Sequence, residues 1–550
     1  MKKKLFCISI AFLLCFVFIA GFISCSGKKE AAPQGPVQKL TYSRNALPTI
    51  DPQNFNAAPS NGAIKGYSEG LIQYHLGKVT PGVAESWEIA PDNKSMTFHL
   101  RKDAKWSDGS PLTARDFVYG FRRLADPKNN FSYRWVLDEI VNGGDIAYGD
   151  GSIPVEQLGV SAPDDYTFVI NFGVPAPYYL AFLEMPPFHP VKQELVEKWG
   201  TEYAMSADKL LGNGPFIVKE YLFEQKVVYT PNPNYWNKDA IKLDEVTLLI
   251  MEDDAAFAAF QSGEIDIANI PLGVAPQYLE NPSLLPGANV ESYYMGAVDW
   301  FSINIASTSN RILGNKDFRL ALNYALDREQ YIKISSNDIY EPATRFVLPA
   351  VSGERRSYTE EFPVDVYKAN AEIDKAKQHL NAAMSAMGIS SPNQITITIK
   401  VGDNTPVLIP ENCQDQWQKA LGINVKIEVV PYRSMLNDRV AGDFDLVYAG
   451  WMPDFDDPYT YLGYFTSNNS QNGGKFSNAR YDELVTTANN FTNPATRLGM
   501  YAEAEKILLE EAGIIPLQIR QLPWAYKSNL KSFNRHFLGA QEDWIYAYFE

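Results

Sequence analysis

Cysteine and histidine, the residues that most often build catalytic and metal centres, are scarce in this sequence. The 550 residues include four cysteines and five histidines. Three of the cysteines lie within the first 25 residues, which leaves Cys413 alone in the remainder. A lone cysteine excludes an intrachain disulfide bond. Cys413, Trp417 and Leu421 are spaced by four, as on one face of a helix, so we interpret Cys413 as a core residue.

The short motifs of hydrolases and zinc proteins are missing as well. The sequence has no G-x-S-x-G, no H-E-x-x-H and no paired C-x-x-C. The histidines lie far apart in the chain, at His75, His99, His189, His379 and His536. These absences argue against a hydrolase and against a zinc site, and no motif in the sequence indicates another cofactor.

Positive charge is also in short supply. The chain has 49 Lys and Arg against 65 Asp and Glu, a formal net charge of −16 at pH 7. So acidic a chain argues against nucleic acid as a partner and against docking on a membrane through a polybasic surface.

The N-terminus has the pattern of a secretory signal. "MKKK" is followed by an apolar run from Leu5 to Ile23, and "FISC" then places Ser24 before Cys25. We predict a signal peptide over residues 1–24, cleavage before Cys25, and attachment of lipid to Cys25. An uncleaved membrane anchor is the alternative, because the apolar run is close to the length that spans a bilayer.

A polar stretch, "SGKKEAAPQGP", follows Cys25 and predicts a flexible tether over residues 25–40. The remaining chain is too long for a single hydrophobic core, which implies two or three domains.

Residues 395–450 alternate between strand and helix patterns. "ITITIKV" places Ile395, Ile397, Ile399 and Val401 on one strand face, "ENCQDQWQKALG" predicts a helix, and "NVKIEVV" predicts another strand. This is a βαβ unit, which implies parallel strands in an α/β fold. A helix over 432–441 and a strand over 444–449 are expected to follow.

Three acids follow that last strand, in "AGWMPDFDDPYTYL". Asp454, Asp456 and Asp457 lie among aromatic residues, at the strand end where open α/β sheets bind ligands. A calcium-binding loop is disfavoured, because this stretch lacks the glycine and the glutamate found at EF-hand spacing. A solvated acidic loop without a binding role is the alternative. A carboxylate among aromatic rings best suits a cationic group, which the acid pairs with and the rings shield.

Several stretches, in order along residues 40–545, resemble one family. They are "PGVAESWEIAPDNKSMTFHLRKDAKWSDGSPLTARDFVYGFRRLADP", "NGPFIVKEY", "NPNYWNKDAIKLDEVTLLI", "FQSGEIDIA", "FRLALNYALDRE" and "GWMPDFDDP". The chain resembles the periplasmic oligopeptide-binding proteins, the peptide-type (family 5) solute-binding subunits of ABC importers.

The resemblance implies a three-domain, periplasmic-binding-protein-like α/β fold of type II, with two lobes joined by a two-strand hinge near 290–300 and 515–525. Domain I would comprise 41–68, 188–295 and 521–550, domain II 69–187, and domain III 296–520. The ligand would be buried between domains I and III.

The resemblance also implies roles for individual residues. Asp454 matches the aspartate that pairs with the α-ammonium group of a peptide. Gly450, Trp451 and Met452 match a backbone segment that pairs with the extended peptide like a neighbouring strand, which gives affinity without selecting side chains.

Asn56, Ala57 and Ala58 match the opposing edge of the site, and Tyr133 matches a tyrosine that lines it. Arg439 matches an arginine near the far end of the peptide; as an alternative, it simply stabilises a helix C-terminus.

Two positions depart from the family's pattern. Tyr448 replaces an arginine and Pro406 replaces a histidine, which in peptide-binding relatives help to hold the peptide's C-terminus. Asn56 also replaces an acidic residue of some relatives.

These expectations add up to a monomeric, lipid-anchored protein on the periplasmic or cell-surface face of a bacterial membrane. It would capture oligopeptides and deliver them to ABC permease subunits with cytoplasmic ATPases. A non-peptide ligand on the same scaffold, or a surface sensor or adhesin without transport, are the alternatives.

Overall fold

The computed structural model describes residues 38–550 except 57–58, 76–77, 470 and 539–541. The predicted signal peptide 1–24, the predicted lipid site Cys25 and most of the predicted tether lie outside the described residues. The tether was expected to extend to residue 40, but strand β1 begins at Lys39 and Leu40 is buried in the sheet.

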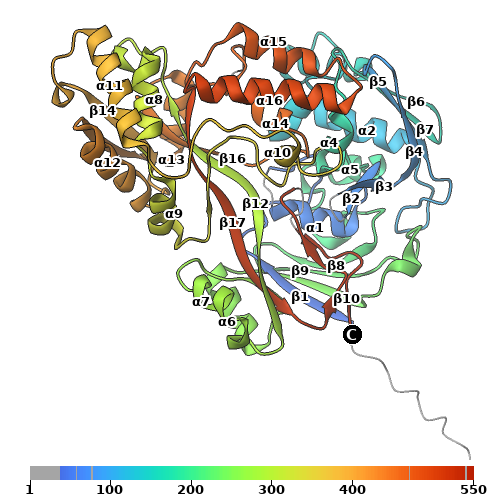
Figure 1. The fold of residues 1–550 in the computed structure, drawn as a ribbon. Helices are drawn as coiled ribbons and strands as arrows, with labels where there is room; N and C mark the ends of the chain where they lie inside the picture. The colour runs from blue at the N-terminus through green and yellow to red at the C-terminus, as the bar shows by residue number, and fades with distance from the viewer. Residues whose placement is uncertain (1–37, 57–58, 76–77, 470, 539–541) are drawn as a thin grey trace, which may run out of the picture. The chain divides into compact units, whose positions relative to one another are not determined.

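A mixed sheet of 11 strands organises the described chain (Figure 1). In spatial order its strands are β15 (Asn424–Val430), β14 (Thr396–Gly402), β16 (Leu446–Trp451), β12 (Ala288–Ile303), β17 (Ile514–Lys527), β11 (Ile267–Asn269), β1 (Lys39–Arg44), β10 (Glu245–Ile250), β9 (Lys226–Pro231) and β8 (Phe216–Leu222), with β13 (Glu341–Pro342) beside β17. β14 pairs in parallel with both β15 and β16, which confirms the predicted βαβ unit.

The smaller sheets come mostly from the N-terminal third. One has the order β4 (Ala84–Ile89), β5 (Ser95–Leu100), β7 (Thr167–Asn171) and β6 (Val160–Asp164). The two-stranded pairs are β2 (Ile72–His75) with β3 (Lys78–Pro81), β18 (Leu530–Lys531) with β21 (Tyr548–Phe549), and β19 (Asn534–Arg535) with β20 (Glu542–Asp543).

Helices cover these sheets. The α-helices are α1 (Pro59–Tyr67), α2 (Ala114–Ala125), α3 (Gly143–Tyr148), α4 (Tyr179–Phe182), α5 (Gln193–Trp199), α6 (Asp253–Ser262), α7 (Ala275–Glu280), α8 (Lys316–Tyr324), α9 (Arg328–Ser336), α10 (Tyr358–Glu361), α11 (Ile373–Met387), α12 (Leu408–Leu421), α13 (Tyr432–Ala441), α14 (Tyr459–Leu462), α15 (Ala479–Ala488) and α16 (Pro494–Glu510). Within the described part of the chain, none of them combines the length and apolar character needed to cross a membrane.

Helix α12 and strand β16 belong to the region that the sequence predicted in most detail, and the acidic stretch follows β16. Cys413, Trp417 and Leu421 are all buried on one face of α12, as predicted. The last strand of the predicted run, β16, was expected over 444–449 but spans Leu446 to Trp451. Gly450 and Trp451 therefore belong to the strand itself. Asp454 lies three residues beyond its end.

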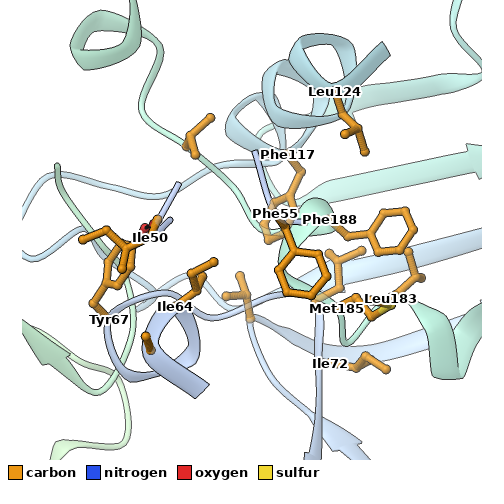
Figure 2. Close-up of a cluster of buried hydrophobic side chains, with 14 of the residues drawn as sticks. Ile50, Phe55, Ile64, Tyr67, Ile72, Phe117, Leu124, Leu183, Met185 and Phe188 are labelled. Carbon is orange, nitrogen blue, oxygen red and sulfur yellow. Dashed lines mark hydrogen bonds between the residues drawn. The ribbon is translucent and has the colours of Figure 1, made fainter. Parts of the chain in front are cut away.

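The apolar side chains form two large buried groups. The first draws on residues 40–267 and 524–549 and also includes Phe455, while the second draws mostly on residues 298–519. Figure 2 shows part of the first group, where Phe117 and Phe188 pack near Phe55 and Met185. Phe455, in the middle of the acidic stretch, therefore packs in the first buried group, although its neighbours in sequence belong mostly to the second.

Two long antiparallel strands, β12 and β17, run side by side through the large sheet (Figure 1). Their register shifts at two places, between Tyr294 and Val298 and between Asp299 and Trp300. At the first, the three residues 295–297 of β12 lie opposite a single residue of β17, Arg520. Such a bulge bends a strand pair and increases its local twist. Gly296 lies inside this bulge with φ +87°, a conformation that favours glycine.

Candidate functional site

A cavity of about 1000 Å³ opens beside the end of β16. Half of the described residues that line it are aromatic. The lining residues are Phe55, Asn61, Tyr133, Trp135, Asp138, Glu139, Tyr148, Tyr178, Phe182, Met185, Trp451, Met452, Pro453, Asp454, Phe455, Tyr459, Thr460, Gly463, Tyr464, Asn469, Gln471 and Phe537. A cavity of this size, mostly apolar with a few polar groups, is typical of a ligand-binding site.

Asp454 presents an uncompensated carboxylate to this cavity. Among the described residues, no hydrogen bond or ion pair reaches its side chain; only its backbone N–H is bound, donating to Thr460 Oγ1 at 3.2 Å. Burial alone raises the pKa of Asp454 from 3.8 to about 7. A buried carboxylate without a partner is costly, so this position is suited to a cationic ligand group that would relieve the cost.

The other two acids of the stretch have structural roles instead. Asp457 forms a buried ion pair with Arg497 and accepts a hydrogen bond of 2.9 Å from the backbone N–H of Tyr459. Asp456 accepts hydrogen bonds from Tyr74 and Ser352. The three carboxylates therefore do not act together, and the described residues contain no group of three or more His, Cys, Asp or Glu placed to hold a metal ion.

Aromatic rings hold the acidic stretch against the opposite wall of the cavity. Phe455 stacks on Tyr178, with ring centroids 4.9 Å apart, and Tyr459 lies 4.6 Å from the same ring. Trp451 lies 5.4 Å from Tyr464, and its indole N–H donates to Thr460 Oγ1 at 3.4 Å. These contacts fix the backbone on both sides of Asp454.

One edge of β16 has no strand partner near the cavity. β12 pairs with β16 along its whole length from Leu446 to Trp451, whereas β14 pairs only with Leu446 and Val447. Along the described strands, the backbone from Ala449 to Trp451 is thus free to accept an added strand on the β14 side. Gly450 is needed here because a Cβ would lie 2.6 Å from Asp299 Oδ1.

The other predicted residues lie at or near this cavity to different degrees. Trp451, Met452 and Tyr133 line it, while Asn56 is exposed next to the lining residue Phe55. Burial, with a further contribution from the charge of Asp454, raises the pKa of Tyr133, so their side chains are near one another. Ala57 and Ala58 lie outside the described residues.

Arg439 lies behind the cavity wall rather than in it. It belongs to the last turn of α13, and its guanidinium donates to Oε1 of the lining residue Gln471 at 3.4 Å. Its Nε is buried with no hydrogen-bond partner, and no acid pairs with it among the described residues. Both readings of Arg439 are therefore compatible with its position: a cation at a helix C-terminus, and a cation beside the site.

Sequence reasoning missed an arginine next to Tyr448. Tyr448 is buried, and Arg520 Nη2 donates to its hydroxyl oxygen at 3.4 Å. Arg520 comes from β17 and forms a two-pronged ion pair with the buried Asp299, at 2.8 Å for each contact. Pro406 is exposed. The guanidinium of Arg520 thus lies near Tyr448, the position where the family's arginine is missing, but Asp299 already neutralises its charge.

Two acids in the cavity wall were also missed. Asp138 and Glu139 follow a short 3-10 helix, η1 (Ser132–Leu137), and line the cavity. In sequence they are an ordinary pair of acids after an apolar turn, and no spacing signal singles them out. Only the folded wall places them in the same cavity as Asp454.

A family model matches residues 78–473, most of the described chain; its description is bacterial extracellular solute-binding proteins, family 5 Middle. The chain belongs to this family. The resemblance inferred from the sequence is therefore confirmed, and family 5 proteins are binding proteins by their description.

Individual relatives match over almost the whole chain. Dipeptide-binding protein DppE of Bacillus subtilis is 29% identical over 556 residues, which cover 98% of this chain and 97% of DppE. Periplasmic murein peptide-binding protein MppA of Escherichia coli is 31% identical over 514 residues, 92% of each chain.

The fold is shared with solved structures of the family. The unliganded open form of MppA superposes with a TM-score of 0.79 at 28% identity, covering 94% of this chain and 98% of that one. This agreement, with the large mixed sheet and its covering helices, confirms the predicted periplasmic-binding-protein-like α/β fold.

Proposed function

We propose that this protein captures oligopeptides outside the cytoplasm and delivers them, chemically unchanged, to an ABC importer. The observation that carries the proposal is the unpartnered carboxylate of Asp454 beside the free edge of β16. An extended peptide has a cationic N-terminus and a backbone that pairs with a strand edge, so one ligand class satisfies both features. The names of DppE and MppA, which are peptide-binding proteins, support the same class.

In this proposal the α-ammonium group pairs with Asp454 and the peptide backbone pairs with Gly450 and Trp451. Because backbone groups are common to all peptides, and water can fill spare room around side chains, we expect many sequences to bind. Arg439, which contacts the lining residue Gln471, is the candidate cation for the C-terminal end of the peptide.

The proposal includes closure of two lobes around the ligand. The predicted domain I (41–68, 188–295, 521–550) and domain II (69–187) largely correspond to the first buried group, and domain III (296–520) to the second. β12 and β17 would serve as the hinge, since they pass between the residues of both groups. Small-angle scattering with and without ligand tests this closure.

The proposal also places the protein on the periplasmic or cell-surface face of a bacterial membrane through lipid on Cys25, as a monomer. Its support is the "FISC" sequence before a polar segment. Uptake of peptides in a strain that lacks this protein tests the transport role, and mass spectrometry of copurified ligands separates peptides from other solutes.

Calorimetry with one tetrapeptide and its N-acetylated form tests the binding mode directly. Removing one partner of a buried charge pair costs about 2–5 kcal/mol, or roughly 30-fold or more in affinity. We expect that loss on acetylation for the natural protein, and a similar loss for the free peptide with Asp454→Ala. Equal affinities for the two peptides would contradict the proposal.

A further inference from the structure

The wall of the cavity that η1 provides carries both rings and charge. Tyr133 and Trp135 of η1 lie with their ring centroids 5.7 Å apart. Asp138 and Glu139 follow immediately, and Tyr148 from the end of α3 also lines the cavity. The wall thus contributes two carboxylates and three aromatic rings to the lining of one cavity.

The charges that line the cavity all have one sign. Asp138, Glu139 and Asp454 are its acids, and the described lining residues include no Lys, Arg or His. The nearest base on this wall, Arg134, donates to Asn130 Oδ1 at 2.7 Å and lies over the ring of Tyr148 at 4.7 Å. The cavity therefore holds more negative charge than the single N-terminus of a peptide would neutralise.

The two acids of this wall differ in their surroundings. Glu139 accepts a hydrogen bond of 2.7 Å from the hydroxyl group of Tyr178, which orients its carboxylate. Asp138 is exposed to the cavity, and its carboxylate has no partner among the described residues. The surrounding wall partly desolvates Asp138 and raises its pKa to about 6, and no cation among the described residues compensates its charge.

We propose that Asp138, supported by Glu139 and the rings of Trp135 and Tyr148, forms a subsite for a basic side chain, Lys or Arg, of the bound peptide. The inference rests on the proposed function and adds a preference to it. Asp138 would pair with the side-chain cation, and the rings would shield that pair and contact the cation through their faces. A divalent metal fits less well, because hard cations prefer several oxygen ligands to aromatic rings.

Matched peptides separate this charge from side-chain bulk. Three tetrapeptides carry one lysine at position 1, 2 or 3 among alanines, and their partners carry norleucine, a neutral residue of similar shape, instead. We expect the lysine form to bind about 10-fold or more tightly than its partner at one position, the scale of a charge-assisted hydrogen bond. Asp138→Asn should reduce that preference below about 3-fold.

Asp145→Asn is the control, because Asp145 is an exposed acid on α3 that does not line the cavity. It should keep the preference for lysine. An equal loss in both variants would mean that the overall negative charge causes the preference, which overturns the subsite.

Two other outcomes are decisive. If lysine and norleucine peptides bind the natural protein equally well, the subsite is wrong while peptide binding stands. If none of the six peptides binds, the proposed function itself fails and the subsite with it.

Discussion

The hydroxyl group of Tyr74 donates a hydrogen bond of 2.9 Å to the carboxylate of Asp456. Ser352 donates to the same carboxylate from its backbone N–H at 2.8 Å and from its hydroxyl group at 2.6 Å. Tyr74 lies in β2 and Ser352 in the segment between β13 and α10. Asp456 therefore fastens the segment after β16 to two distant parts of the chain, while the carboxylate of Asp454 has no partner among the described residues.

Asp456→Ala should lower the free energy of unfolding by about 1–3 kcal/mol, because it leaves the buried hydroxyl group of Tyr74 without an acceptor and removes the two hydrogen bonds from Ser352. Urea denaturation measures the change, and Tyr74→Phe, which removes only one of the donors, should cost less. An unchanged stability would mean that the pair of Asp457 and Arg497 holds the loop without help from Asp456.

Asp454→Asn should have the opposite effect on the ligand-free protein. The folded-state pKa of Asp454, about 7, lies above its usual value of 3.8, so the folded state binds the proton more tightly. The carboxyl group therefore destabilises the fold increasingly as the pH rises from about 4 to 7. Above pH 7 the variant should be more stable than the natural protein, by at most about 4 kcal/mol, and below pH 4 the two should be equal. Thermal unfolding across this range checks the sign.

The same pKa makes peptide binding depend on pH. An α-ammonium group needs the ionised form of Asp454, so binding below pH 7 should release a proton. Affinity should fall by up to about tenfold for each pH unit below 7. Calorimetry in buffers of different ionisation enthalpy measures the proton release. Proton uptake, or a pH profile that Asp454→Asn leaves unchanged, would contradict the assignment.

The N-terminal end of the peptide should matter more than the C-terminal end. Tyr448 and Pro406 supply no cation, Arg520 is paired with Asp299, and Arg439 stands behind the wall. Amidation of the peptide's C-terminus should therefore change the binding free energy by less than about 0.5 kcal/mol, the scale of an exposed ion pair. A large loss on amidation, abolished by Arg439→Gln, would make Arg439 the principal anchor.

Ligand should draw the lobes together and alter the surroundings of Trp451. Small-angle scattering should give a smaller radius of gyration at saturating peptide, since hinge closure makes a molecule more compact. The tryptophan fluorescence should change with the same dependence on concentration, and Trp451→Phe should remove that change. A radius that stays constant at saturation would indicate a rigid receptor.

Mass spectrometry of the mature chain tests the N-terminus. Cys25 should be the first residue and should carry acyl groups, because "FISC" has the pattern that precedes lipid attachment. Cys25→Ser should leave residues 1–24 attached. A mature chain that begins at another residue without acyl groups would refute lipid anchoring.

Local pattern was enough to predict the part of the site that lies on one continuous segment. Alternating Ile395, Ile397 and Ile399 predicted β14, and the acids after β16 were expected at a ligand-binding edge. The strand end was misplaced by two residues because Gly450 and Trp451 extend the pairing with β12, and a glycine in a strand gives no local signal of its partner.

The rest of the site depends on contacts between distant segments. Arg520 is 72 residues away from Tyr448 in the chain, and no sequence pattern around either residue predicts their contact. Asp138 and Glu139 become cavity residues only because Tyr178 and Phe455 bring two walls together. Pairing and burial of this kind arise from the folded chain, so single-sequence patterns cannot predict them.

The bulge at Gly296 limits how such a receptor can change over generations. A Cβ at Gly296 would lie 2.6 Å from the Phe537 carbonyl oxygen and 3.0 Å from Cδ of Pro453, the residue before Asp454. The Gly296 carbonyl oxygen also accepts a hydrogen bond of 3.1 Å from Tyr461. If β12 and β17 form the hinge and Asp454 pairs with the ligand, as we propose, a substitution of Gly296 would disturb both. The η1 wall belongs to other elements. Substitutions there could therefore change the proposed side-chain preference one residue at a time, without altering the proposed hinge.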